Sequence, residues 1–156
     1  MQKNLPEVAV VITDTSCLIL LKKLNALHLL NHLYSTIITT PEVANEFGET
    51  LPSWIEIKRS DSVLTETFKS NIDEGEASAI ALALEIHADI LITDDAKARK
   101  FAELHNLNVK GSAGVLLMAK QVGLISELKP FFDAIKNTNF RVAPSILESI
   151  LRQAGE

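Results

Sequence analysis

The sequence predicts an α/β fold in which a central, mostly parallel sheet is covered by helices on both faces. Short β-branched segments alternate along the chain with longer amphipathic or alanine-rich segments. Each connection is long enough for a βαβ unit. The segment Val8–Thr13 is an unbroken apolar run, as expected of a central parallel strand that is buried on both faces.

Strands and helices alternate through the first half of the chain. Pro41 stands where proline is favoured, in the first turn of a helix. Trp54–Lys58 alternates apolar and polar residues, which favours a short strand. The predicted elements are, in order, a strand over Val8–Thr13, helices over Ser16–Leu24 and Leu27–Leu33, a strand over Thr36–Thr39, a helix from Pro41 to about Phe47, a strand over Trp54–Lys58 and a helix over Ser62–Ser70.

The second half repeats this alternation and then becomes helical. Glu74–Ile86 is rich in alanine and leucine, which strongly favours a helix. The elements that follow are a strand over Asp89–Thr93, a helix over Asp95–His105, a strand over Leu107–Lys110, a helix from Gly111 to Ala119 and two helices over about Ile125–Lys136 and Pro144–Gln153. No repeat, low-complexity tract or linker divides the sequence, so we expect one domain over residues 1–156.

The bulk composition is that of an ordinary globular protein. Of the 156 residues, 47% are hydrophobic and 22% are charged, which argues against disorder. No apolar run is long enough for a membrane span, and the N-terminal apolar segment leads into Asp14 instead of a secretory cleavage pattern. Cys17 is the only cysteine, which excludes a disulfide within the chain and a thiolate metal site. We therefore expect a reducing, cytoplasmic location with no membrane attachment.

The net charge of −5 argues against a protein that coats nucleic acid, because binding to the phosphate backbone usually rests on lysine and arginine. Acids gathered in one pocket could account for an excess of that size, and bound divalent cations would offset it locally. The charge is therefore compatible with a metal-dependent nuclease.

Asp14 ends the first predicted strand and is followed by Thr15 and Ser16. A carboxylate at this place can coordinate a hard cation while the hydroxyl of Ser16 orients it. These residue types are also favoured helix caps, and for this motif alone capping is the stronger interpretation.

Glu46 and Glu42 both lie in the segment PEVANEF. Glu42 falls in the first turn of the predicted helix, where its charge complements the helix dipole. Glu46 has no such structural role, although a solvent-exposed helix face is the commoner place for a single glutamate. We favour Glu46 as the functional acid.

The segment Asp73-Glu74-Gly75-Glu76 opens the alanine-rich helix. Capping and the helix dipole explain Asp73 and Glu74. Glu76 borders the side of the helix that is expected to pack on the sheet, which favours a role as a metal ligand.

Asp94 and Asp95 follow a predicted strand directly. Adjacent carboxylates repel each other, so a cation or a hydrogen-bond network is expected nearby. Capping explains one of the two acids more easily than both, and for this pair we favour function.

In a parallel sheet, the ends of strands meet at one edge, which is where ligands bind. The acid-bearing segments should therefore come together, and their hard oxygens suit magnesium or manganese. The four histidines are scattered without paired spacing, which argues against zinc.

At this point the chain resembles the PIN-domain family. The segments that carry the resemblance, in this order, are VVITDTSCLILLKKL, TTPEVANEF, DEGEASAIALALE, LITDDAKARKFAE and GSAGVLLMAKQVGLI. They cover about Val8 to Leu124 and are most similar to the small stand-alone prokaryotic chains related to VapC-like toxins.

The resemblance implies a three-layer α/β/α sandwich that binds Mg²⁺ or Mn²⁺ and hydrolyses RNA. It places the catalytic and metal-binding acids at Asp14, Glu46, Glu76 and Asp95, with Asp94 as an additional metal-binding neighbour. Glu76 stands where many PIN domains have aspartate, and its longer side chain shifts the carboxylate outward. It also implies that Ser16 supports Asp14, and that the chain pairs with an antitoxin protein.

Three cations follow Asp95 directly and could contact the RNA backbone: Lys97, Arg99 and Lys100. A solvent-exposed helix face is the commoner explanation of such a run. Two other functions stay open. One is a non-catalytic PIN-fold module that binds RNA or protein. The other, ranked lower, is a phosphotransfer fold, for which the acids here are differently spaced.

The last two predicted helices offer more apolar surface than a small sandwich obviously needs. The residues concerned are Phe131, Phe132, Ile135, Ile146, Ile150 and Leu151. An apolar surplus often marks an association surface, and similar PIN proteins are commonly dimeric, so we expect a homodimer. Simple covering of the sheet by these helices explains the surplus about equally well.

Overall fold

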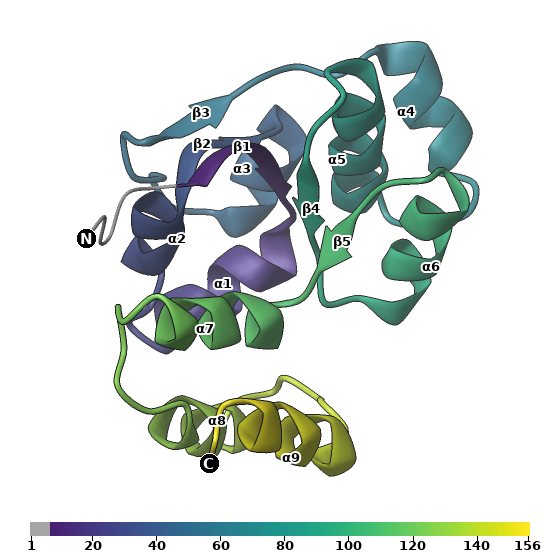
Figure 1. The fold of residues 1–156 in the computed structure, drawn as a ribbon. Helices are drawn as coiled ribbons and strands as arrows, with labels where there is room; N and C mark the ends of the chain where they lie inside the picture. The colour runs from purple at the N-terminus through teal and green to yellow at the C-terminus, as the bar shows by residue number, and fades with distance from the viewer. Residues whose placement is uncertain (1–6) are drawn as a thin grey trace.

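A computed structural model describes residues 7–156 and contains one five-stranded sheet (Figure 1). The expected absence of a secretory signal rests partly on residues 1–6, which lie outside the described residues. The strands are β1 (Glu7–Thr13), β2 (Tyr34–Thr39), β3 (Ile55–Ile57), β4 (Ile90–Ile92) and β5 (Val109–Lys110). Their order is β3-β2-β1-β4-β5, and every neighbouring pair is parallel, as the sequence predicts.

Nine helices accompany the sheet within the described part of the chain. They are α1 (Thr15–Lys23), α2 (His28–Leu33), α3 (Pro41–Phe47), α4 (Ser62–Phe68), α5 (Glu74–Glu85), α6 (Ala96–Leu104), α7 (Ser112–Gln121), α8 (Lys129–Lys136) and α9 (Pro144–Gln153). The predicted order of elements is confirmed. One boundary is wrong, because the helix expected from Ile125 begins at Lys129. Pro130 lies in its first turn, and proline has no backbone N–H with which to continue a helix that began at Ile125.

The central strand β1 is buried on both faces, as its unbroken apolar sequence predicts. Val11 belongs to a core formed with α1, α2 and α7, whereas the next residue, Ile12, belongs to a core formed with α5 and α6. This alternation follows from the two-residue period of a strand. The molecule is therefore an α/β/α sandwich with one apolar core on each side of the sheet (Figure 1).

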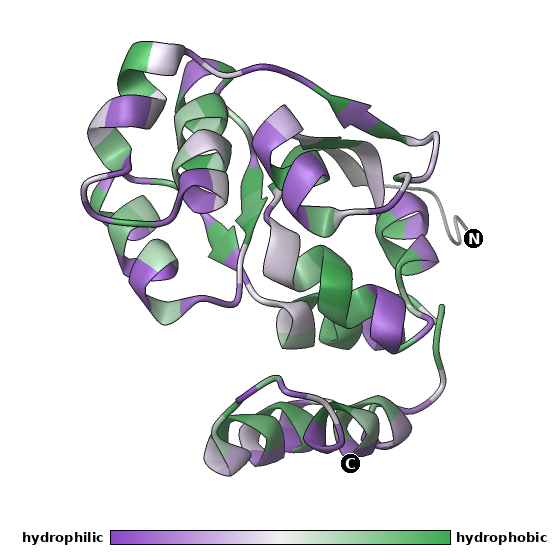
Figure 2. Cartoon of the chain, turned by 180° about the vertical axis from the view of Figure 1, so that it is seen from behind, coloured by the Kyte–Doolittle hydropathy of each residue, from purple (hydrophilic) through white to green (hydrophobic). Residues whose placement is uncertain are grey.

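The helices α8 and α9 lie beyond α7, on the outer side of one layer (Figure 1). Both carry hydrophobic and hydrophilic residues along their length (Figure 2), as expected of helices that pack on one side. Phe132 and Ile135 of α8 and Leu147 of α9 are buried in the same core as α7. Part of the apolar surplus that suggested a homodimer is thus used within the chain.

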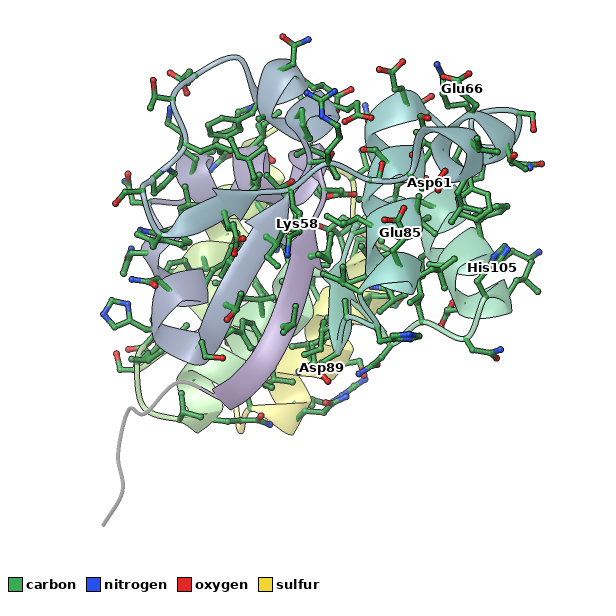
Figure 3. The ribbon with its side chains drawn as sticks, turned by 90° about the horizontal axis from the view of Figure 1, so that it is seen from above. Lys58, Asp61, Glu66, Glu85, Asp89 and His105 are labelled. Atoms are coloured by element: carbon green, nitrogen blue, oxygen red, sulfur yellow. The ribbon has the colours of Figure 1, made fainter. Side chains whose placement is uncertain are left out.

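Acids at the amino ends of the strands and acids at their carboxyl ends have different roles. Asp89 precedes β4, and its carboxylate accepts a hydrogen bond from the backbone N–H of Val10 at 2.7 Å (Figure 3). At the opposite edge, Thr13 of β1 pairs with Ile92 of β4, so the residues that follow these two strands begin side by side. Among the described residues, no helix is long and apolar enough to cross a membrane.

Candidate functional site

Side chains from several elements line one pocket of about 370 Å³ at the carboxyl ends of β1 and β4. All five acids selected from the sequence lie there. The residues that line the pocket are Asp14, Thr15, Ser16, Glu46, Asp73, Glu76, Asp94, Asp95, Asn139, Phe140 and Arg141. The expected convergence of acids at one edge of the sheet is therefore present in the structure.

Asp14 is at once a helix cap and a wall of the pocket. Its Oδ1 atom accepts a hydrogen bond from the backbone N–H of Cys17 at 3.2 Å, which makes it the N-cap of α1. The hydroxyls of Ser16 and Thr93 donate to the same carboxylate, which is only 2% exposed. Burial raises the pKa of Asp14 to about 7, against the lowering effect of these hydrogen bonds, and the charge of Asp94 raises it further.

Glu76 and Asp95 share the electrostatics of this pocket. Burial, followed by the negative charges of Asp95 and Asp14, raises the pKa of Glu76 to about 7. The Oε1 atom of Glu76 accepts a long hydrogen bond of 3.4 Å from the backbone N–H of Asp73. Asp95 caps α6, where it accepts from the backbone N–H of Ala98 at 2.8 Å. The negative charges of Asp95 and Asp14 are therefore close enough to disfavour ionisation of Glu76.

Glu46 reaches the pocket from the last turn of α3, which ends at Gly48 in the left-handed conformation that glycine favours. Its carboxylate lies over Gly75 of α5, and a methyl group added to Gly75 would come within 3.1 Å of the Oε1 atom of Glu46. The absent side chain at Gly75 thus allows α3 to approach α5. Glu42 is not among the residues that line the pocket.

Asp94 has a hydrogen-bond network whose partners the sequence did not predict. The backbone N–H of Ser112 donates to its Oδ1 atom at 2.8 Å, and the hydroxyl of Ser112 donates to its Oδ2 atom. The Sγ atom of Cys17 lies 2.8 Å from that hydroxyl. Burial raises the pKa of Asp94, and burial also raises the pKa of the Cys17 thiol, which is therefore a neutral partner at the start of α7.

The three predicted cations are separated in the structure. Lys97 and Lys100 are exposed, and neither lines the pocket. Arg99 is partly buried, and its positive charge lowers the pKa of Asp94 against the larger effect of burial. A methyl group at Gly111 would lie 2.8 Å from both Arg99 Nη2 and Asp94 Oδ1. Because Gly111 has no side chain, the Arg99 guanidinium and the Asp94 carboxylate can both lie close to its backbone.

The segment Asn139-Phe140-Arg141 was not selected from the sequence. It connects α8 to α9 and brings an amide, an aromatic ring and a cation to the acidic pocket. The signal that could have identified it in the sequence is this combination of amide, ring and cation between two amphipathic helices. Its place against acids far earlier in the chain depends on how α8 and α9 pack on α7.

The donor set suits a divalent cation. It consists of carboxylate and hydroxyl oxygens, the ligands that magnesium and manganese prefer. Burial first, and then the negative charge of neighbouring acids, raises the pKa values of Asp14 and Glu76, and a bound cation would oppose both effects. Thr15, only 6% exposed, also lines the pocket, and its buried Oγ1 atom has no hydrogen-bond partner among the described residues.

The acids are not, however, drawn tightly together. Among the described residues, no three carboxylate, histidine or cysteine side chains form a ready-made ligand set. Magnesium usually keeps several water molecules and needs only one or two carboxylates in direct contact. The residues present therefore fit a hydrated cation.

A family model described as PIN domain matches residues 10–156. No curated protein and no solved structure matches the chain.

Proposed function

The chain belongs to the PIN-domain family, and on that premise we propose that it is a magnesium- or manganese-dependent endoribonuclease that hydrolyses phosphodiester bonds in RNA. PIN domains are generally nucleases and generally use divalent metal ions. The observation that carries the proposal is that Asp14, Glu46, Glu76 and Asp95, from four separate segments, line one pocket.

In this proposal the four acids supply oxygen ligands for the metal. When bound, the cation supplies Lewis-acid chemistry, which activates water and stabilises negative charge on the phosphate. The hydroxyls of Ser16 and Thr93 orient the Asp14 carboxylate toward the pocket. Asp94 also lines the pocket, but both of its oxygens accept hydrogen bonds from Ser112, so we propose that it acts through its charge.

The remaining roles concern partners and context. We propose that Lys97, Arg99 and Lys100 contact the RNA backbone, and that the protein is the toxin of a toxin–antitoxin pair in the cytoplasm. We also propose a single domain that forms a homodimer through α8 and α9, where Phe131 and Leu151 are partly exposed. A neighbouring reading frame that encodes a short DNA-binding chain would support the toxin assignment, and its absence would count against it.

The test is cleavage of single-stranded RNA with magnesium or manganese and its loss in EDTA. Asp14→Asn and Asp95→Asn should each lose most activity, because each removes one charge and barely changes shape. Glu46→Gln should also lose activity, while Glu42→Gln on the same helix should not. Wild-type rates in both aspartate variants would assign the cleavage to a contaminant.

A second candidate is a non-catalytic PIN-fold module that binds RNA or protein. It is favoured by the lack of a ready-made ligand set among the described residues. Millimolar manganese should raise the melting temperature of a metal-dependent nuclease, since the ion binds only the folded state. An unchanged melting curve together with RNA binding and no cleavage would favour the non-catalytic module.

A further inference from the structure

A groove of about 500 Å³ adjoins the acidic pocket. It runs between the α6–β5–α7 segment and the α8–α9 pair, and its size lies in the range of ligand-binding pockets. Its lining consists of Asp94, Ala96, Arg99, Val109, Lys110, Gly111, Ala113, Gly114, Arg141, Val142, Ala143, Ile146 and Ile150. Asp94 and Arg141 line both the groove and the acidic pocket, so the two cavities are neighbours.

The charge of the groove is opposite to that of the pocket. Three of its lining residues are cations, Arg99, Lys110 and Arg141, and only Asp94 is an acid. Within the described residues, none of the three cations forms an ion pair, whereas Lys120 is paired with Glu156. In a chain with a net charge of −5, this local excess of positive charge faces an open cavity and suits a polyanion.

The rest of the lining is apolar and partly open to solvent. Ile146, on the first turns of α9, is 53% exposed, and Val142 and Ile150 are partly buried beside it. Phe140, next to Arg141, lines the acidic pocket at the junction with the groove. Surfaces that bind single strands combine cations that follow the phosphate backbone with aromatic side chains on which bases stack. Here Phe140 supplies an aromatic ring at the junction, and Val142, Ile146 and Ile150 add apolar surface along the groove. In a duplex the base faces are stacked on one another, so only unpaired bases can use such a surface.

We propose that this groove holds the single-stranded RNA that leads away from the cleavage pocket, with Arg141 at the junction as a phosphate contact. Arg99 and Lys110 contact the backbone farther along, and the apolar side of α9 contacts the bases. This assignment rests on the proposed nuclease function, which places the RNA at the acidic pocket. It adds the path that the strand follows from there.

The experiment measures RNA binding without cleavage. A short fluorescein-labelled oligouridine is titrated with protein in EDTA at several salt concentrations, and anisotropy gives the dissociation constant. Arg141→Ala and Lys110→Ala should each weaken binding about tenfold and lower the slope of log affinity against log salt by about 0.7, the value for one lost single-strand phosphate contact. The matched controls are Arg59→Ala and Lys58→Ala, exposed cations that follow β3 and line neither cavity; Lys58 is labelled in Figure 3.

Manganese-dependent cleavage of the same RNA is measured in parallel, so that the two proposals fail separately. Wild-type protein that cleaves, with groove variants that bind like the controls, would overturn the groove and keep the nuclease. Loss of binding in the groove variants alone, in a protein that never cleaves, would keep the groove and overturn the nuclease. No binding by the wild type in EDTA would also overturn the groove.

Two further measurements distinguish the occupant. Duplex RNA should bind more weakly than oligouridine, and stronger duplex binding would contradict the single-strand assignment. Ile146→Ala, at an exposed position, should weaken oligouridine binding without changing the mass measured by light scattering. A dimer that Ile146→Ala dissociates would place a second copy of the chain in the groove and overturn the proposal.

Discussion

Replacing Asp14 by asparagine should raise the free energy of unfolding of the metal-free protein above pH 7. The reason is that Asp14 is buried as a carboxylate among other acids, and asparagine keeps its shape without its charge. A residue proposed to be essential for activity is therefore expected to reduce stability when no metal is bound.

The magnitude follows from the pKa of this group. Burial raises the pKa of Asp14 from its ordinary value of 3.8 to about 7. At about 1.4 kcal/mol for each pH unit, ionising Asp14 in the folded protein costs about 4 kcal/mol more than in the unfolded chain. Between pH 4 and pH 7 the folded state holds more protons than the unfolded state, so stability falls as pH rises through this window. About 2 kcal/mol of the loss lies between pH 5 and pH 7.

The assay is urea denaturation in EDTA at pH 5, 6, 7 and 8. Relative to the wild type, the free energy of unfolding of Asp14→Asn should rise by up to about 3 kcal/mol from pH 5 to pH 8, because only the wild type ionises this residue. Asp133→Asn, at an exposed position of α8, should run parallel to the wild type. Saturating manganese should raise the free energy of unfolding of the wild type at pH 8, by about 2.7 kcal/mol at one hundred times its dissociation constant. The increase should be smaller for Asp14→Asn. A constant difference between Asp14→Asn and the wild type from pH 5 to pH 8 would refute the reasoning.

Three further predictions follow from close contacts and exposed surface. Gly75→Ala should slow RNA cleavage while leaving the melting temperature unchanged or higher. The added methyl group would come tightly against the flexible end of Glu46, at 3.1 Å, and make an ordinary contact with Thr15 Oγ1 at 3.5 Å, and alanine favours a helix. Gly111→Ala should lower the free energy of unfolding by about 1–3 kcal/mol, measured in urea, because its methyl group would lie 2.8 Å from both Arg99 Nη2 and Asp94 Oδ1. Light scattering should give the mass of a dimer, and a monomer mass at high concentration would contradict the expected homodimer.

The elements that the sequence predicts best are those whose signals are local. Proline fixes the first turn of α3 and of α9, and both helices occupy the predicted residues. The unbroken apolar run of β1 identifies a strand buried on both faces. The predicted start of α8 was wrong because Leu124, Ile125 and Leu128 continue a helical apolar spacing. In the structure these residues pack against the core from an irregular segment instead.

In the candidate site too, residues with a local sequence signal could be predicted, and residues placed by tertiary contacts could not. Asp14, Glu76 and Asp95 could be selected because they stand at strand ends or helix starts, which a parallel sheet brings to one edge. The hydrogen bonds from Ser112 to Asp94 join residues 18 positions apart, and Arg141 reaches the pocket only through the packing of two helices on a third. Contacts of this kind depend on tertiary geometry, for which a single sequence has no periodic signal.

Capping and metal binding, treated as alternatives in the sequence, describe the same side chains in the structure. Asp14 caps α1, Asp95 caps α6, and Asp94 accepts hydrogen bonds from the first residue of α7. The positive ends of these helix dipoles lower the cost of gathering several carboxylates in one pocket. The backbone partners of these acids hold them around the pocket before any cation arrives. A substitution that removes one of these acids therefore changes helix capping and proposed metal binding together. For this reason a loss of activity can be attributed to the metal site only where the unfolding free energy, measured in EDTA, is unchanged or raised.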